Sequence, residues 1–354
     1  MKKIEIFLKN VLLRVLLLLK SGRSRHNGPV SFNENSKLLF IRLNRIGDAL
    51  VTTPLIQEVK RQLKCRIFVL ADRKNSFVFT NNPNVDEVIV FRKGFKGFLE
   101  VLSLIKLDNF DAIIDLHDDV STTVTYLLAM AKAKNKFGLK KGNEIVYTKT
   151  VEKPDPSKFH VIDRLMSLVS LFGISYCKEE INVGYFPKPV AIDKAGEVLK
   201  RRFPGKKFLL GINISAGSQA RFWGVERYRE LIGFLESYDI YVLLLCSVNE
   251  APQALEITRG KEDNIFYSPS FDEFASMISK LDMLFTPDTM AVHLASAFMV
   301  PVFGIYVHFN TKDMIWTPYR SDFECVITEN NTLSEVTFNQ VIQKFKPFLE
   351  KYIS

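Results

Sequence analysis

Short apolar runs alternate with amphipathic stretches along most of the chain. The run KLLFIRL at residues 37–43 is apolar at nearly every position, which predicts a strand buried on both faces of a sheet. The stretch 48–63 spaces its apolar residues three and four apart, as a helix packed on one side does. This alternation predicts strands at Lys37–Leu43, Arg66–Leu70, Val85–Val90 and Ala112–Leu116, and helices at Asp48–Leu63, Gly97–Leu107 and Val161–Phe172. Such an order predicts a parallel sheet covered by helices on both faces.

The pattern breaks at Pro187-Lys188-Pro189 and then starts again. A length of 354 residues also suits two domains. We therefore expect an α/β protein with two Rossmann-like, doubly wound domains at residues 36–187 and 188–354, after a leader at residues 1–35. Ligands of such sheets bind at the carboxyl ends of the strands, so the ligand is expected in a cleft between the domains. The second domain is predicted to have strands at Phe208–Asn213, Tyr241–Cys246, Met283–Thr286 and Pro301–Tyr306, and helices at Val225–Ser237, Phe271–Ser279, Ala291–Ala297 and Leu333–Tyr352.

The first 30 residues form a separate, basic segment. They hold seven Lys and Arg residues against one Glu, and their apolar residues recur at helical spacing. Arg14 interrupts the apolar stretch between Lys9 and Lys20, which leaves the segment too short to span a membrane. Residues 21–25 offer no small-residue signal-cleavage site. We expect residues 1–25 to lie as an amphipathic helix on an anionic membrane surface, the alternative being a helix packed on the protein's own body.

The rest of the chain is close to neutral. The whole sequence has 48 Lys and Arg against 39 Asp and Glu, a net charge of +9, most of which belongs to the leader. Nucleic-acid-binding domains carry a basic stripe on their folded surface, so no nucleic-acid partner is expected. The four cysteines are far apart and form no CxxC pair. This spacing argues against a zinc ribbon or a disulfide scaffold and suits a cytoplasmic protein.

Three junctions that follow predicted strands are candidates for binding phosphate. No G-x-G-x-x-G follows a strand and no P-loop motif exists, so nicotinamide enzymes and P-loop NTPases lack their usual signature here. Each junction combines Gly or small hydroxyl residues with an expected helix start, where free backbone N–H groups favour anions. Taken singly, each could be an ordinary helix cap. The junctions are Arg45-Ile46-Gly47-Asp48, Ser215-Ala216-Gly217-Ser218 and Thr286-Pro287-Asp288-Thr289.

Taken together and in order, these segments resemble glycosyltransferase family 9, the lipopolysaccharide core heptosyltransferases. The resemblance extends over roughly residues 36–350 and leaves only the leader outside. It is carried by Arg45–Pro54, by His160–Arg164 with the following Leu165–Gly173, by Asn213–Gly217 with Arg221–Trp223 and Glu226–Tyr228, by Asp288–Ala295 followed by Pro301-Val302, and by Trp316-Thr317-Pro318.

The resemblance implies a GT-B fold, with the acceptor bound mainly by the first domain and the nucleotide sugar by the second. It also implies transfer with inversion at the anomeric carbon, without an essential metal and without a cofactor, since the ADP-sugar is a substrate. Asp48 matches the family's catalytic base, and a helix cap is the alternative. Gly47 is expected to allow close backbone approach or a positive φ. The residues expected near the acceptor are Arg45, Gly47, His117, Asp118 and Arg164.

The second domain would bind the donor. Arg221 stands where the family commonly has Lys and would meet the diphosphate, which Arg can bind through two hydrogen bonds. Ser215, Gly217, Thr289 and the N–H groups that begin the Ala291 helix would complete the phosphate site. The resemblance places Asp288 toward the donor sugar. Glu250 would accept from the ribose hydroxyls or else be a solvated loop acid, and His293 would orient the phosphate or merely pack.

Three positions depart from the family pattern. Met290 replaces a small Gly, Val307–Asn310 stands in place of a Gly-Pro-Thr-like turn, and His117-Asp118-Asp119 replaces Gln-Gly after Asp115-Leu116. The last change bears on the identity of the acceptor. A metal site there is not expected, because adjacent residues at a strand end rarely point at one ion.

These observations favour one function over two others. We expect an enzyme that transfers heptose from ADP-heptose to the lipopolysaccharide core, whose acceptor is anchored through lipid A. We expect it to be peripheral, on the cytoplasmic face of the bacterial inner membrane. One alternative keeps the family and mechanism but uses a UDP- or ADP-hexose. Another is a non-catalytic membrane-associated homologue, favoured only by Met290 and the missing turn.

Overall fold

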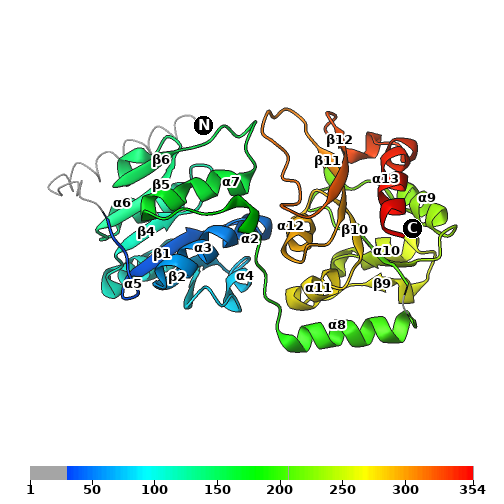
Figure 1. Ribbon diagram of the computed structural model, residues 1–354, viewed down its shortest axis with the longest axis horizontal. Helices are drawn as coiled ribbons and strands as arrows, with labels where there is room; N and C mark the ends of the chain where they lie inside the picture. The colour runs from blue at the N-terminus through cyan, green and yellow to red at the C-terminus, as the bar shows by residue number, and fades with distance from the viewer. Residues whose placement is uncertain (1–29, 206, 354) are drawn as a thin grey trace. The chain divides into compact units, whose positions relative to one another are not determined.

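The computed structural model describes residues 30–205 and 207–353, so the amphipathic helix predicted for residues 1–25 of the leader lies outside the described residues. The chain divides into two compact units between Gly184 and Tyr185, a few residues before the boundary expected from the sequence. Unit 1 denotes here residues 30–184, and unit 2 denotes residues 185–353 (Figure 1).

Unit 1 is built on six parallel strands in the order β3-β2-β1-β4-β5-β6. Strand β1 lies between β2 and β4, so the strand order reverses there. Open α/β sheets bind ligands beyond the carboxyl ends of the strands at such a point. The four predicted strands are present, and β5 and β6 extend the sheet. The strands are β1 Lys37–Arg42, β2 Arg66–Asp72, β3 Glu87–Phe91, β4 Ala112–Asp115, β5 Asn135–Lys140 and β6 Lys149–Glu152.

Helices cover both faces of this sheet, and the alternation of side chains along β1 decides which residues meet them. Leu39 and Ile41 belong to the buried cluster that includes Val101 of α5 and Leu127 of α6. Phe40 points to the other face and stacks on Phe172. The helices are α2 Ile46–Leu50, α3 Thr53–Leu63, α4 Phe77–Thr80, α5 Phe95–Asp108, α6 Thr122–Met130 and α7 Val161–Met166, with 3-10 turns at Glu144–Val146, Ser167–Phe172 and Lys178–Glu180.

The single helix predicted at Asp48–Leu63 is in fact two helices, α2 and α3. Pro54 has no N–H and cannot donate to the carbonyl of Leu50, four residues earlier. The hydroxyl of Thr53 makes that hydrogen bond instead, at 2.7 Å, and Thr52 donates to Ala49 in the same way. The break therefore leaves Asp48 on a separate one-turn helix that directly follows β1.

Unit 2 has the same strand order as unit 1, written β9-β8-β7-β10-β11-β12. Its order reverses between β7 and β10, which are paired. All the pairs are parallel. The four predicted strands are again present, flanked by two that the sequence pattern missed, β9 and β12. The strands are β7 Leu209–Asn213, β8 Tyr241–Leu245, β9 Ile265–Phe266, β10 Met283–Pro287, β11 Val302–Val307 and β12 Phe323–Thr328.

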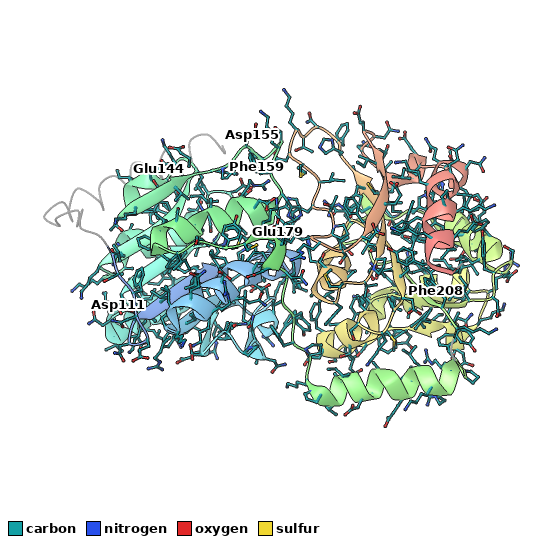
Figure 2. The ribbon with its side chains drawn as sticks, viewed as in Figure 1. Asp111, Glu144, Asp155, Phe159, Glu179 and Phe208 are labelled. Atoms are coloured by element: carbon teal, nitrogen blue, oxygen red, sulfur yellow. The ribbon has the colours of Figure 1, made fainter. Side chains whose placement is uncertain are left out.

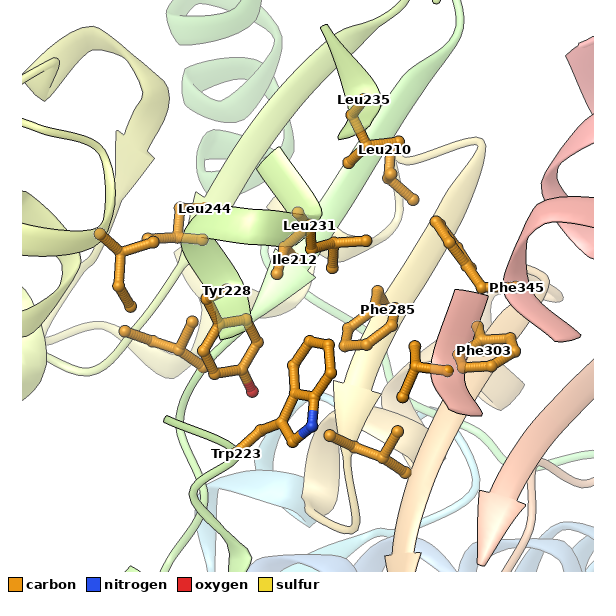
Figure 3. Close-up of a cluster of buried hydrophobic side chains, with 14 of the residues drawn as sticks. Leu210, Ile212, Trp223, Tyr228, Leu231, Leu235, Leu244, Phe285, Phe303 and Phe345 are labelled. Carbon is orange, nitrogen blue, oxygen red and sulfur yellow. The ribbon is translucent and has the colours of Figure 1, made fainter. Parts of the chain in front are cut away.

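The core of unit 2 combines aromatic and aliphatic side chains (Figure 3). The fully buried Trp223 lies 5.3 Å from Tyr228 and 5.6 Å from Phe285, measured between ring centroids. Its indole N–H donates to the carbonyl of Val336 at 2.9 Å, which satisfies the one polar atom of the side chain. Helices α9, α10 and α13 contribute to this core. The helices of unit 2 are α8 Pro189–Arg202, α9 Val225–Leu235, α10 Ala251–Ile257, α11 Phe271–Ile278, α12 Met290–Ala297 and α13 Phe338–Ile353.

Helix α8 begins at Pro189, one of the two prolines that the sequence pattern marked only as a break. Proline suits the first turn of a helix, because the N–H groups there have no intrahelical partner. The helix expected at Leu333–Tyr352 is a 3-10 turn at Leu333–Glu335 followed by α13. None of the helices in the described part of the chain is long and apolar enough to cross a membrane.

Candidate functional site

The first junction lies where β1 ends and α2 begins. Asn44 has a positive φ of 94°, and Arg45 is the extended N-cap residue of α2. Gly47 lies inside α2 and has helical backbone, so of the two roles expected for it the positive φ is wrong, and close backbone approach stays a prediction. The sharp turn occurs at Asn44, where Asn is tolerated in the left-handed region. Arg45 is exposed, and Asp48 stands in the first turn of α2.

Asp48 is held by an arginine from the strand before it. The Arg42 guanidinium is buried, and its Nη2 lies 3.3 Å from Oδ1 of Asp48. Its Nη1 donates to the carbonyl of Leu116 at 2.6 Å, which ties the end of β1 to the end of β4. Burial lowers the pKa of Arg42, and the nearby carboxylates oppose that shift. The side chain of Asp48 keeps 19% of its surface exposed. The carboxylate is thus fixed in orientation and still open to solvent.

A buried network surrounds the last residue of β4, Asp115. Its carboxylate accepts hydrogen bonds from Lys141 at 2.9 Å and from the Tyr147 hydroxyl at 2.6 Å, and it contacts His117 Nδ1 at 2.7 Å. Burial opposes the ionisation of Asp115, but these three partners outweigh it and hold its pKa below the usual range. Tyr147 can approach because Gly138 has no side chain, since a Cβ there would lie 2.6 Å from the Tyr147 ring.

His117 is neutral in this arrangement. The backbone N–H of Leu43 donates to its Nε2 at 3.2 Å, so that nitrogen has no proton and Nδ1 carries the proton donated to Asp115. Burial lowers the pKa of His117 and outweighs the attraction of Asp115. The ring therefore connects the ends of β1 and β4 as a structural link.

Asp118 is engaged on the other side of the same loop. Arg164 of α7 donates to both of its oxygens, from Nε at 3.1 Å and from Nη2 at 2.8 Å, and Lys153 lies 3.3 Å away. Burial raises the pKa of Asp118, but these cations lower it further than burial raises it. Arg164 also donates to the carbonyl of Phe159, in the segment that leads into α7 (Figure 2).

The structure thus brings together four of the site residues predicted in unit 1, but it gives them different surroundings. Asp48 is partly open, whereas His117, Asp118 and Arg164 are buried among partners within unit 1. Sequence reasoning missed Arg42, Lys141, Tyr147 and Lys153. Arg42 had a signal, because it is the one charged residue in the apolar run 38–43. The other three lie on or beside β5 and β6, the strands that the pattern did not predict.

The second junction, after β7, is not a helix start, contrary to the sequence prediction. Residues 215–218 lead into a 3-10 turn at Gln219–Arg221, and α9 begins only at Val225. The N–H of Ser215 donates to the Asn213 side chain at 3.2 Å, and the N–H of Ser218 donates to Ala216 at 2.7 Å. Gly217 has a φ of +62°, and a Cβ there would meet nothing within 4 Å. Local hydrogen bonds therefore shape this loop, and no α-helix begins there whose dipole could favour an anion.

The side-chain amide of Asn213 joins the third junction to the strand end that precedes the second. Nδ2 of Asn213 donates to the hydroxyls of Thr286 at 2.9 Å and Thr289 at 3.2 Å. Thr289 is the N-cap of α12, and it accepts from the N–H of Ala291 at 3.3 Å. The N–H of Val292 donates to the Thr289 carbonyl. In this structure the cap residue therefore uses the N–H groups of Ala291 and Val292.

Arg221 and Asp288 form an ion pair between these two junctions. Nη2 of Arg221 lies 3.2 Å from Oδ2 of Asp288, and Nη1 donates to the Asp288 carbonyl at 3.2 Å. The side chain of Arg221 remains partly exposed. A cation in this state can exchange its carboxylate partner for a phosphate without leaving a buried charge.

Glu250 is bound to the Ser215 loop and to Ser247. Its carboxylate accepts from the hydroxyls of Ser215 and Ser247 and from the N–H of Ser247, with which it forms a capping box. His293 is buried on α12, and its ring centroid lies 6.0 Å from that of Trp316. Within the described residues, no group of three or more His, Cys, Asp or Glu side chains is arranged to hold a metal ion.

The chain matches a known family. A model of glycosyltransferase family 9 (heptosyltransferase) matches residues 101–346. The chain is also 24% identical over 297 residues to the lipopolysaccharide core heptosyltransferase OpsX of Haemophilus influenzae, a match that covers 80% of this chain and 82% of that protein.

Solved structures share its fold. The chain resembles a family 9 glycosyl transferase from Veillonella parvula, with a TM-score of 0.79, 18% identity, and coverage of 92% of this chain and 100% of the other. It also resembles Escherichia coli heptosyltransferase WaaC with ADP, with a TM-score of 0.68, 18% identity, and coverage of 89% and 99%. The same enzyme has been solved with ADP-2-deoxy-2-fluoro heptose. The expected α/β, GT-B fold of two Rossmann-like domains is thus confirmed.

Proposed function

The chain belongs to glycosyltransferase family 9, the heptosyltransferase family, and from that premise we propose that it transfers heptose from ADP-heptose to the lipopolysaccharide inner core, with inversion and with Asp48 as the general base. The observation that carries the proposal is the carboxylate of Asp48, held by the buried Arg42 at the carboxyl end of β1 and still open to solvent.

The ion pair with Arg42 gives Asp48 the orientation that a general base needs. In a single displacement, a base accepts the proton of the acceptor hydroxyl while the bond between the sugar and the diphosphate breaks. Arg42 is itself held by the carbonyl of Leu116, directly after β4. The orientation of Asp48 therefore depends on the backbone at the end of β4. One oxygen of the carboxylate contacts Arg42, which leaves the other for the hydroxyl.

Unit 2 supplies the groups that would bind the donor. The leaving ADP gains negative charge in the transition state, and Arg221 would stabilise it, with Ser215, Gly217 and Thr289 around the phosphates. Asp288, the present partner of Arg221, would turn to the hydroxyls of the sugar. Glu250 would accept from the ribose. The solved complexes of WaaC with ADP and with ADP-2-deoxy-2-fluoro heptose support a nucleotide sugar of this kind.

Among the residues of unit 1, Arg45 is the one we propose to contact the acceptor directly, because it is exposed beside Asp48. Gly47 would allow the acceptor close to α2. His117, Asp118 and Arg164 would act by holding the loops in place, since their polar atoms already have partners. We further propose that the reaction needs neither a metal nor a cofactor, and that the enzyme works at the cytoplasmic face of the inner membrane, where residues 1–25 would bind anionic lipid.

The test is an Asp48→Asn variant assayed with ADP-heptose and a truncated lipopolysaccharide acceptor. Loss of the base should lower the rate of transfer by about 100-fold or more, while ADP binding stays as in the wild type. Asp155→Asn, at an exposed carboxylate of unit 1, is the matched control and should transfer normally (Figure 2). Normal turnover by Asp48→Asn would refute the assignment of the base.

A second candidate keeps the mechanism and changes the donor to a UDP- or ADP-hexose. It is favoured by Met290 at the first residue of α12 and by the exposed Phe309 in the segment after β11, since both differ from the family pattern. Thermal shifts measured with ADP-heptose, ADP-hexose and UDP-hexose separate the two candidates, because the true donor stabilises the folded enzyme most at equal concentration.

A further inference from the structure

Helix α5 of unit 1 presents apolar side chains to solvent. Its inner side packs Val101, Leu102 and Ile105 into the core. On its outer side, Phe95 is 78% exposed, Leu99 42% and Leu107 84%. The α5 outer face is defined by these three side chains together with the exposed residues between them, Lys96, Glu100, Ser103 and Lys106.

The members of this face share one side of the helix. At 100° per residue, Phe95, Lys106 and Leu99 lie within about 40° of arc, and Leu107 lies about 120° from Phe95. Leu99, Ser103 and Leu107 also line an open hollow on the surface of the helix. Soluble proteins rarely place large apolar side chains together on one exposed side without a partner.

Four exposed cations and two acids lie around the face, and one of the cations, Lys93, also lies 3.9 Å from the carboxylate of Asp72. Lys96 and Lys106 stand among the apolar side chains, and Arg92 and Lys93 precede the helix, all of them exposed. The acids nearby are Glu100 and Asp108. Apolar and aromatic side chains surrounded by Lys and Arg match the boundary of an anionic bilayer, where the rings and aliphatic chains enter below the headgroups.

Two other occupants fit the charges less well. The leader is itself strongly basic, with seven Lys and Arg against one Glu in residues 1–30, so docking it here would bring like charges together. A second copy that used the same face would do the same. We propose that the α5 outer face binds directly to an anionic lipid surface. This goes beyond the proposed function and depends on neither the donor nor the base.

Tryptophan placed in the face tests the proposal in the full chain. Both native tryptophans belong to unit 2, so Leu107→Trp adds a probe whose signal is the difference from wild type. Vesicles of phosphatidylglycerol and phosphatidylethanolamine that carry a doxyl-labelled lipid should shift the new emission to the blue and quench it. Phosphatidylcholine vesicles should do neither. Ile327→Trp, at a half-exposed apolar position on β12, is the matched control and should stay unquenched.

Binding measured by vesicle sedimentation gives the second readout. The double variant Phe95→Ser with Leu107→Ser should partition about tenfold more weakly into the anionic vesicles, whereas Ile327→Ser should bind as wild type does. Added salt should weaken wild-type binding, because screening reduces the attraction of the cations.

Three results would overturn the proposal. The first is full binding to vesicles without quenching of the tryptophan at position 107, which would assign binding to another segment. The second is a blue-shifted tryptophan already shielded from an aqueous quencher before vesicles are added, which would mean that the chain itself covers the face. The third is a concentration-dependent dimer that the double Ser variant abolishes, which would make the face a contact between copies.

Discussion

The two sheets have the same strand order, but the side chains at the carboxyl ends of their strands differ: they are charged in unit 1 and mainly neutral in unit 2. In unit 1, buried charges gather at the end of β4, centred on Asp115 and on the pair of Asp118 with Arg164, and Arg42 joins this end to that of β1. In unit 2, the ends of β7 and β10 are joined by the amide of Asn213 and by threonine hydroxyls, with one partly exposed ion pair nearby.

This difference between charged and neutral strand ends fits the ligand that each unit is proposed to bind. A buried charge network is costly to rearrange, so it suits a scaffold that must aim Arg42 and Asp48 in one direction. Neutral hydroxyl and amide groups, with one exchangeable cation, can accept an anion at little cost. The same topology thus supports a rigid edge in unit 1 and an adaptable edge in unit 2.

The largest effect that tests this comparison is expected at Lys141. Lys141→Met leaves the fully buried Asp115 without its cation and should destabilise unit 1 by about 3–5 kcal/mol. The neighbouring Lys140 is exposed and pairs with exposed Glu152, so Lys140→Met should cost less than about 1 kcal/mol. Urea unfolding followed by far-UV circular dichroism measures both. Equal midpoints for the two variants would show that the buried network is not what stabilises unit 1.

The next largest effect is expected when Arg221, the partly exposed cation of unit 2, is replaced. Arg221→Gln removes a charge-assisted contact to phosphate worth about 1.5–3 kcal/mol, so ADP should bind about 10-fold to 100-fold more weakly. Titration calorimetry with ADP is the measurement. Arg229→Gln, on α9 beside Glu226 and Glu256, is the control and should bind ADP as wild type does. Unchanged affinity in Arg221→Gln would place the diphosphate elsewhere.

A smaller effect is expected from the titration of His117. Burial lowers the pKa of His117 in the folded protein, whereas an unfolded histidine titrates at about 6.5. As the pH falls through about 6.5, the unfolded chain takes up a proton that folded His117 does not. Stability should therefore decrease by up to about 1.4 kcal/mol per pH unit, until the folded pKa is reached. Urea unfolding of wild type and His117→Asn between neutral and acidic pH should show a steeper loss in wild type. Parallel curves would mean that folded His117 takes up its proton at the same pH as the unfolded chain does.

The smallest effect is expected at the cap of α12. Thr289→Ala removes the hydroxyl that accepts from Ala291 and from Asn213, and it should cost about 1 kcal/mol. Tryptophan fluorescence follows this change in unit 2 alone, because both tryptophans lie there. Thr289→Ser keeps the hydroxyl and should stay near wild type. A loss as large as that expected for Lys141→Met would mean that the edge of unit 2 is as rigid as that of unit 1.

Apolar periodicity found the central strands and the edge strand β3, and it missed the edge strands β6, β9 and β12 together with β5. Strands β1 and β10 are mostly apolar and almost entirely buried, and the sequence predicted both. Strands β5, β6 and β12 mix charged and apolar residues, because an edge or near-edge strand has less surface to bury, so no clear period marks them. The split between α2 and α3 depends on the missing N–H of one proline, which a period of 3.6 residues does not register.

The sequence by itself determined the two α/β halves, the family, and the positions of Asp48, Arg221 and Asp288 at the ends of strands. These follow from local patterns and motifs, which a linear chain displays directly. Only the tertiary structure decided that Arg42 holds Asp48, that Asp115 gathers Lys141 and Tyr147, and that Asn213 joins two junctions 73 residues apart. Such contacts arise because parallel strands bring their carboxyl ends to one edge, so their partners depend on strand order and not on distance along the chain.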